Sequence, residues 1–495
     1  MMKTAIIVSV IGVGSLLAGA QPALTIYNQD FAVVRDTVRL DLNAGENTVN
    51  YSEATAHVEP DSVILRDPAG KHPLQILEQN YRNDPVSQDL LLSLFEGKTI
   101  DFETRDKDGQ PSIIKGKIIR SGYVPHYSAM NDFGEEYQQQ QMTMATEGQP
   151  IVEVDGQMRF SLPGQPLFPD LGDDTILKPT LNWLIQSEKS GRFDAEVGYI
   201  TGGFTWKADY NLVSPEKGDN VDLVGWITVD NQSGKTFKDA KIKLMAGDVN
   251  KIQPQRFPMY QRAMAMDSVA GMAAAPPVTE KAFDEFHLYT LERPTTLRDR
   301  ETKQVEFVHA EGIQSKTVYV YDGADMDQYQ GWDASNPQYG TQANKKIRVM
   351  REFTNSKTNG LGMALPKGRL RFYRRDDDGQ LEFVGEDEID HTPKDETIRV
   401  TTGNAFDLVG ERKQTNYHVN ENNHEADETF EIKLRNHKKE PVTIRVVEHL
   451  YRWNNWEITS HSDDFKKTDS QTIEFNVPVA PDEEKTVTYS VHYSW

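Results

Sequence analysis

The chain has 495 residues, a formal net charge of −22 and no cysteine. Its length is enough for about three domains of ordinary size, and the lack of cysteine excludes disulfides, thiolate metal sites and cysteine nucleophiles. Nucleic acid and anionic membranes repel so acidic a chain, and we therefore expect no nucleic-acid partner.

Residues 1–20 have the pattern of a secretory signal peptide. Lys3 precedes an apolar run over residues 4–17, and residues 18–20 (Ala-Gly-Ala) form a small-residue cleavage site. The run is too short for a transmembrane helix, and no later segment is long and apolar enough. A lipoprotein signal would need a cysteine where Ala20 stands. The sequence therefore predicts an exported protein, periplasmic or extracellular, that is not a lipoprotein and has no transmembrane segment in its mature form.

Most of the remaining chain alternates apolar and polar residues with a period of two, which is typical of strands with one buried face. Residues 84–97 are the exception, where Asp84, Pro85 and Gly97 mark the start and the end of a short helix. Gly, Asn and Asp turns separate the strands at close spacing. The sequence thus predicts a mainly β protein of tandem antiparallel β-sandwich, immunoglobulin-like domains with one or two short helices.

Breaks in this alternation divide the chain. Two similar hairpins, at 221–245 and 428–450, turn at Asn231 and Asn436 and suggest two sandwiches of related design. Polar or Ala/Met-rich stretches read as flexible segments. After the signal peptide we expect an N-terminal β domain (21–178, with a flexible segment at 135–150), a first sandwich (179–321, with a flexible Ala/Met-rich insertion at 261–280), a linker loop (322–346) and a second sandwich (347–495).

Residues 383–415 concentrate the side-chain types that perform acid–base chemistry. The candidate catalytic residues are Asp390, His391, Asp407 and Arg412. The same stretch also reads as an alternating strand at 397–402 that is closed by Gly403 and Asn404. No GxSxG, SxxK, Walker or dinucleotide motif occurs in the chain. A structural role for these charges is therefore favoured over catalysis.

One loop, residues 321–333, is rich enough in aspartate to suggest a calcium site. Its weak candidate ligands are Asp322, Asp325, Asp327 and Asp333. A solvated acidic loop explains them better. The histidines lack the spacing of a zinc or copper site. We therefore expect no cofactor, with calcium or another divalent cation as the alternative.

Long strings in the second half carry a resemblance to a known family. They are YITGGFTWKADYNL (199–212), LVGWITVDNQSGKTFKDAKIKLMAGDVN (223–250), LYTLERPTTLRDRETKQVEF (288–307), LPKGRLRFYRRDDDGQLEFVGEDEIDHTPKDETIRVTTGNAFDLVGERKQT (365–415) and IKLRNHKKEPVTIRVVEHL (432–450). From about Asp194 to Trp495 the chain resembles the family of unknown function that forms the C-terminal domain of mucoidy inhibitor A-like bacterial proteins. It lacks the long coiled-coil middle of those proteins. The resemblance implies an exported β-sandwich protein and brings no established catalytic residues.

These inferences predict an exported, soluble, non-enzymatic β-sandwich protein. Its partner would be a protein of the cell envelope or a surface or extracellular glycan. The alternative is a hydrolase-like or divalent-metal-binding protein with its site around Asp390, His391, Asp407 and Arg412.

Overall fold

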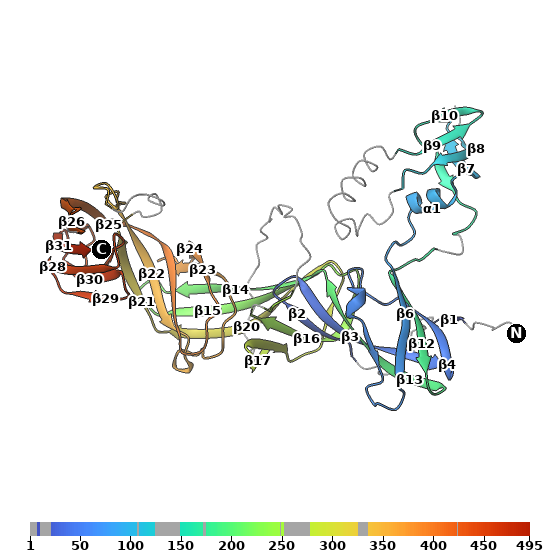
Figure 1. Ribbon diagram of the computed structural model, residues 1–495, viewed down its shortest axis with the longest axis horizontal. Coiled ribbons are helices and arrows are strands. Elements are labelled where there is room, and N and C mark those ends of the chain that lie inside the picture. Colours follow the sequence, from blue (N-terminus) through green and yellow to red (C-terminus); the bar gives the residue numbers. More distant parts are fainter. Residues whose placement is uncertain are drawn as a thin grey trace. The chain divides into compact units, whose positions relative to one another are not determined.

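The computed structural model describes residues 7–9, 21–105, 108–123, 149–171, 175–247, 249–251, 278–324, 335–422 and 424–495. Strands make up most of the described chain, which confirms the prediction of a mainly β protein (Figure 1). Of the segments predicted to be flexible, 135–148 and 261–277 lie outside the described residues. The chain divides into two units, each built from separate stretches: 1–206, 229–272 and 290–303 form the first, and 207–228, 273–289 and 304–495 form the second. The sandwich borders predicted at 178, 321 and 346 stay predictions.

The first unit contains three groups of strands. One sheet has the order β1-β4-β12-β6, with β1 (Ile7–Ser9), β4 (Gly45–Tyr51), β12 (Thr180–Ser187) and β6 (Leu74–Arg82). A second includes the order β16-β2-β3-β13-β5, with β16 (Phe237–Ala246), β2 (Ala23–Tyr27), β3 (Phe31–Leu42), β13 (Gly191–Gly202), β5 (Ile64–Arg66) and, beside β16, β19 (Thr295–Leu297). A third has the order β10-β9-β8-β7-β11, with β10 (Gln157–Arg159), β9 (Ile151–Val154), β8 (Pro111–Arg120), β7 (Thr99–Arg105) and β11 (Gln165–Leu167).

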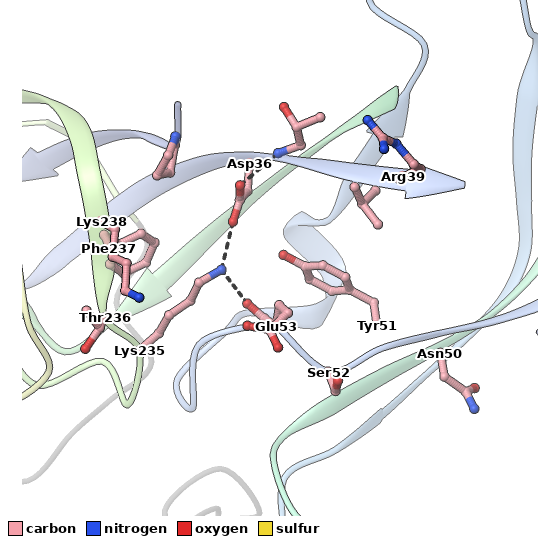
Figure 2. Close-up of a pocket in the computed structure, with 13 residues that line it drawn as sticks. Asp36, Arg39, Asn50, Tyr51, Ser52, Glu53, Lys235, Thr236, Phe237 and Lys238 are labelled. Atoms are coloured by element: carbon pink, nitrogen blue, oxygen red, sulfur yellow. Dashed lines mark hydrogen bonds and ion pairs between the residues drawn. The ribbon is translucent and has the colours of Figure 1, made fainter. Parts of the chain in front are cut away.

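The Lys235 side chain connects two of these sheets. Lys235, just before β16, lies with its Nζ 2.8 Å from Asp36 Oδ2 of β3 (Figure 2). The same amino group donates to the backbone oxygen of Glu53 at 2.6 Å. The lysine thus joins β3, the segment after β4 and the start of β16.

The helix predicted over residues 84–97 is confirmed, although it begins later. α1 spans Gln88–Leu94, and the side chain of Ser87 caps it by accepting a hydrogen bond from the Leu90 N–H at 3.2 Å. Ser87 therefore takes the capping position expected for Asp84. Leu92 and the following Phe95 pack on the sheet of β7 and β8. The described residues include no helix with the length and hydropathy needed to cross a membrane.

The second unit contains two sheets. One has the order β20-β15-β14-β23-β24, with β20 (Glu301–Ile313), β15 (Val221–Asn231), β14 (Phe204–Ser214), β23 (Gly368–Arg375) and β24 (Leu381–Ile389). The other has the order β28-β31-β26-β25-β22-β21-β27-β30-β29, with β28 (Asn455–His461), β31 (Glu484–Ser494), β26 (Glu425–Asn436), β25 (Thr397–Asn420), β22 (Lys346–Thr354), β21 (Ser315–Asp322), β27 (Val442–His449), β30 (Thr472–Val479) and β29 (Phe465–Lys467). Shorter elements are β17 (Val278–Phe283), β18 (Phe286–Leu291) and the 3₁₀ turns η1 (Pro60–Ser62, in the first unit) and η4 (Lys357–Asn359).

The sheets mix antiparallel and parallel pairs. Neighbours in sequence, such as β23 and β24, pair antiparallel. β14 with β23 and β21 with β27 pair parallel across long stretches of chain. The alternating residues of β26, β27, β30 and β31 point into one core and are almost fully buried there. Removing such side chains from water is the main stabilising contribution, at about 1.5–3 kcal/mol for each large aliphatic or aromatic group.

The two asparagines predicted at hairpin turns make the same contacts in their two hairpins. The Asn231 amide donates to the carbonyls of Lys235 and Arg298, both at 2.9 Å. The Asn436 amide donates to Glu440 and Ala480, at 2.9 and 3.1 Å. Each side-chain oxygen accepts from the N–H two residues further on. Both side chains are buried. Each amide therefore supplies hydrogen bonds to backbone carbonyls that water cannot reach.

Candidate functional site

A groove in the second unit has a volume of about 730 Å³. That volume lies within the range of sites that hold small ligands or peptide side chains. The groove is open to solvent and its walls mix aromatic, charged and hydroxyl side chains. Its lining includes Asp219, Tyr319, Arg351, Phe372, Arg374, Val384, Thr402, Phe406, Asp407, Lys438 and Glu440.

A bulge in β25 places Phe406 and Asp407 at this groove. Asn404 pairs with Arg348 and Val409 pairs with Lys346, so residues 405–408 lie opposite the single residue Ile347. Surplus residues in one strand bend it and redirect its side chains. Phe406 is 97% exposed as a result. The strand expected to close at Gly403 and Asn404 instead continues through the bulge to Asn420.

β24 forms one wall of the groove and is the last strand of its sheet. Its first half exposes three apolar side chains, Leu381, Phe383 and Val384, each between 44% and 56% accessible. Its second half lies against β25, where the Thr401 N–H donates to Asp387 Oδ2 at 2.6 Å. A terminal strand with exposed apolar residues is a template for pairing with another chain.

The charges in the groove are partly paired with one another. Arg351 Nη1 lies 2.6 Å from Asp219 Oδ1, and Lys438 Nζ lies 3.8 Å from Glu440 Oε1. Burial lowers the pKa of Arg351, and the pair with Asp219 acts in the opposite direction. Arg374 lines the groove half-buried, and among the described residues we find no hydrogen bond or ion pair for its guanidinium. The groove therefore offers one unpaired cation to an acidic group.

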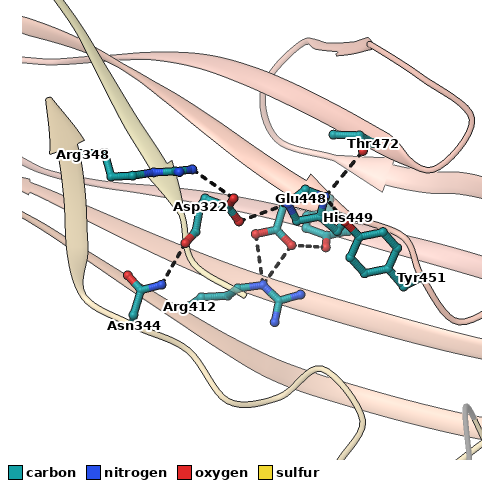
Figure 3. Close-up of polar contacts among 9 residues, drawn as sticks. Asp322, Asn344, Arg348, Arg412, Glu448, His449, Tyr451 and Thr472 are labelled. Carbon is teal, nitrogen blue, oxygen red and sulfur yellow. Dashed lines mark hydrogen bonds and ion pairs between the residues drawn. The ribbon is translucent and has the colours of Figure 1, made fainter. Parts of the chain in front are cut away.

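A second polar arrangement surrounds His449 at the end of β27 (Figure 3). His449 Nε2 lies 3.1 Å from Asp322 Oδ1, and His449 Nδ1 lies 2.7 Å from Tyr451 Oη. Arg348 also pairs with Asp322, at 3.1 Å. A carboxylate, an imidazole and a hydroxyl in a row can relay a proton. Burial, with smaller contributions from Asp322 and Asp469, raises the pKa of Tyr451, so its hydroxyl stays protonated at neutral pH.

Arg412 and Glu448 form an ion pair beside this arrangement, also drawn in Figure 3. Tyr489 donates to Glu448 Oε2 at 2.5 Å, and the Arg412 guanidinium lies over the Phe430 ring at 3.8 Å. Arg412 also donates to the Gly340 carbonyl at 2.6 Å. Hydrogen bonds with these partners satisfy both charged groups, so we assign the pair a structural role in holding the strands together.

The four candidates from residues 383–415 occupy different surroundings. Asp390 and His391 are exposed after β24, and His391 Nδ1 accepts a hydrogen bond from the Lys367 N–H at 3.1 Å. Asp407 is exposed in the groove, and Arg412 is buried against Glu448.

One of the four aspartates considered for calcium, Asp322, lies among the described residues. Asp322 pairs with Arg348 and His449. Asp325, Asp327 and Asp333 lie outside the described residues. Within the described ranges, no three His, Asp or Glu side chains converge as a metal site requires.

Two residues that we consider important in the groove, Phe406 and Arg374, were not among the candidates predicted from the sequence. Phe406 and Arg374 are an aromatic and a basic residue in strands, without a motif around them. A signal for the bulge exists, because the alternation of residues 397–402 fails at Gly403, whose φ is +151°. Nothing local marks β24 as a terminal strand.

Comparison with protein families finds one match, described as a domain of unknown function (DUF4139), over residues 195–495. The matched stretch is more than half of the chain. It begins one residue after the start expected from the resemblance and includes every residue that lines the groove. Comparison with curated proteins and with solved structures finds no match.

Proposed function

The chain belongs to the DUF4139 family, and from that premise we propose that it is an exported, non-enzymatic protein that binds a partner protein of the cell envelope in the groove beside β24. The observation that carries the proposal is Phe406, an aromatic side chain 97% exposed on the groove wall. Covering this exposed ring with a partner removes apolar surface from water and so favours binding. Exposed aromatic residues are frequent anchors of interfaces.

The occupant that fits is an extended segment of the partner. The first half of β24 can accept it as an additional strand, because backbone hydrogen bonds along a terminal strand supply affinity without a particular sequence. Val384 and Phe406 would contact apolar side chains of the added segment. An acidic side chain of the segment would pair with Arg374.

Export and the relationship to mucoidy inhibitor A-like proteins belong to the same proposal. The signal-peptide pattern of residues 1–20 supports export. Cleavage there removes β1 (Ile7–Ser9), so the sheet of the mature chain would begin at β4. Sequencing the N-terminus of the mature chain checks it, and Gln21 is the expected first residue. The resemblance to mucoidy inhibitor A-like proteins supports a role in the bacterial envelope.

Selection from a displayed library of short random peptides tests the proposal. We expect selected peptides to be apolar and acidic, and to slow hydrogen exchange of the β24 amides when bound to the full chain. Phe406→Ala should weaken their binding by roughly tenfold or more, the loss of a typical anchor residue. Arg374→Ala should weaken mainly the acidic peptides.

Phe160→Ala is the matched control, because Phe160 is 67% exposed in the first unit and does not line the groove. It should leave peptide binding unchanged. Peptides that bind equally well to Phe406→Ala, or without protection of β24, contradict the proposal. A glycan array that selects ligands dependent on Phe406 while the peptide library selects none would assign the groove to a glycan instead. Conversion of a bound ligand to products would contradict a non-enzymatic role.

A further inference from the structure

A separate pocket lies within the first unit (Figure 2). Its volume is about 440 Å³, which is within the range of small-molecule sites. Pro22 and three segments line it: residues 36–39 of β3, residues 50–53 at the end of β4, and residues 235–238 at the start of β16. β3 and β4 belong to different sheets, so the pocket lies where the two sheets diverge.

Tyr51, in the wall of this pocket, carries a buried polar group without a partner among the described residues. The residue is 5% exposed, and its hydroxyl has no hydrogen-bond partner among the described residues. The ring stacks on Trp183 with 5.4 Å between the centroids, which fixes its direction. Figure 2 shows the hydroxyl end of the ring directed toward the Lys235–Asp36 pair. A buried hydroxyl without a partner destabilises a fold, so such a group in a pocket wall indicates that something else supplies the partner.

Lys235 and Asp36 pair with each other before any ligand enters. Lys235 Nζ binds Asp36 Oδ2 at 2.8 Å and the Glu53 carbonyl at 2.6 Å. An ammonium group has three N–H donors, so one remains for a ligand. Asp36 Oδ1 accepts from the Thr37 N–H at 2.8 Å, and its remaining lone pairs can accept from a ligand hydroxyl.

We propose that this pocket binds a small neutral polyhydroxylated molecule, of the size of a monosaccharide or a cyclic polyol. The site is independent of the groove beside β24 and of the function proposed for it. A sugar hydroxyl both donates and accepts, and the wall offers both kinds of partner side by side. The Tyr51 hydroxyl and the third Lys235 N–H donate to the ligand, and Asp36 accepts from it.

A charged ligand fits less well. Lys235 and Asp36 neutralise each other in the pocket. Lys238, which also lines it, is exposed to solvent, so an anionic ligand would lose its water for no more than a screened surface pair. Burial raises the pKa of Tyr51 well above its ordinary value, and the neighbouring Tyr199, Asp36 and Glu53 add to the rise. The hydroxyl therefore keeps its proton and acts as a neutral donor.

Titration of the full chain with free monosaccharides and inositol tests the proposal. The readouts are the tryptophan fluorescence, to which Trp183 beneath Tyr51 contributes, and saturation-transfer NMR of the ligand. We expect one or more of these compounds to bind. Tyr51→Phe, which keeps the ring and its stacking, should weaken that binding by roughly tenfold while the protein stays folded.

Tyr199→Phe is the matched control, because Tyr199 is also a buried tyrosine of this unit but does not line the pocket. It should leave sugar binding unchanged. Three results overturn the proposal: no compound of the panel binds, Tyr51→Phe binds them as tightly as the unchanged chain, or charged amino acids bind in a Tyr51-dependent way while the sugars do not.

Discussion

Arg412 and Glu448 form a buried ion pair, in which Arg412 Nε lies 2.9 Å from Glu448 Oε2 and the two side chains are 3% and 0% exposed. β25 supplies the cation and β27 the anion, and two strands of the same sheet, β22 and β21, lie between them. The pair is fully surrounded, with Tyr489 and the Gly340 carbonyl satisfying further donors and acceptors. Its completeness explains why a charged pair is tolerated in an apolar core.

Glu448→Ala should lower the free energy of unfolding by about 3–5 kcal/mol, because it leaves the Arg412 guanidinium buried without its counter-charge. Urea unfolding measures the loss. The double variant Arg412→Met with Glu448→Leu should recover most of it, since neither charge remains to be desolvated. A single variant that loses less than about 1 kcal/mol would mean that the pair is worth no more than an exposed one.

Glu352 makes stability depend on pH. Burial raises the pKa of Glu352. Hydrogen bonds from Lys316 and Arg399 and the charge of Arg445 lower it by more than burial raises it, so the net pKa lies below the ordinary value. A carboxylate with a lowered pKa stabilises the fold above its ordinary pKa, about 4.3, and this contribution is lost as the pH falls through the lowered value.

Glu352→Gln should therefore destabilise the protein at neutral pH, and the difference from the unchanged chain should shrink as the pH falls below about 4. Urea unfolding at a series of pH values measures the difference. Glu382→Gln, an exposed position in β24, is the control and should change little at any pH. A difference that is the same at pH 7 and at acid pH would contradict the assignment to Glu352.

Asn436 should be essential for the hairpin that it turns. Asn436→Ala leaves the Glu440, Val479 and Ala480 carbonyls without their donor, and should cost about 1–3 kcal/mol of unfolding free energy. Thermal or urea unfolding checks the loss. Asn476→Ala, at an exposed position of β30, should stay close to the unchanged chain. Equal stabilities of the two variants would show that the buried amide contributes nothing.

Local features of the fold could be predicted because their causes lie within a few residues. Alternation identified the strands around the core of the second unit, and the sequence of residues 84–97 identified α1. The turns at Asn231 and Asn436 were visible because an asparagine side chain bonds its own following backbone. The helix start was displaced to Ser87 because two nearby residues can both cap, and only packing selects between them.

The candidate site could not be predicted in the same way. Arg412 lies five positions from Asp407, yet its counter-charge is Glu448, brought near by the sheet. Phe406 is exposed because β22 provides one residue where β25 has four, a relationship between strands that neither strand shows alone. From the sequence, Tyr51 is indistinguishable from an ordinary core tyrosine, because only the fold brings Lys235 into the same pocket.

By itself, then, the sequence determined the mainly β class, the helix, the two asparagine turns and the family, because backbone periodicity, capping and long matching strings are local properties of the chain. Only the tertiary structure decided which charges pair, which strand ends a sheet and which hydroxyl lacks a partner. Those properties depend on side chains that are distant in sequence, as Tyr51 and Lys235 are, and on how completely their neighbours exclude water.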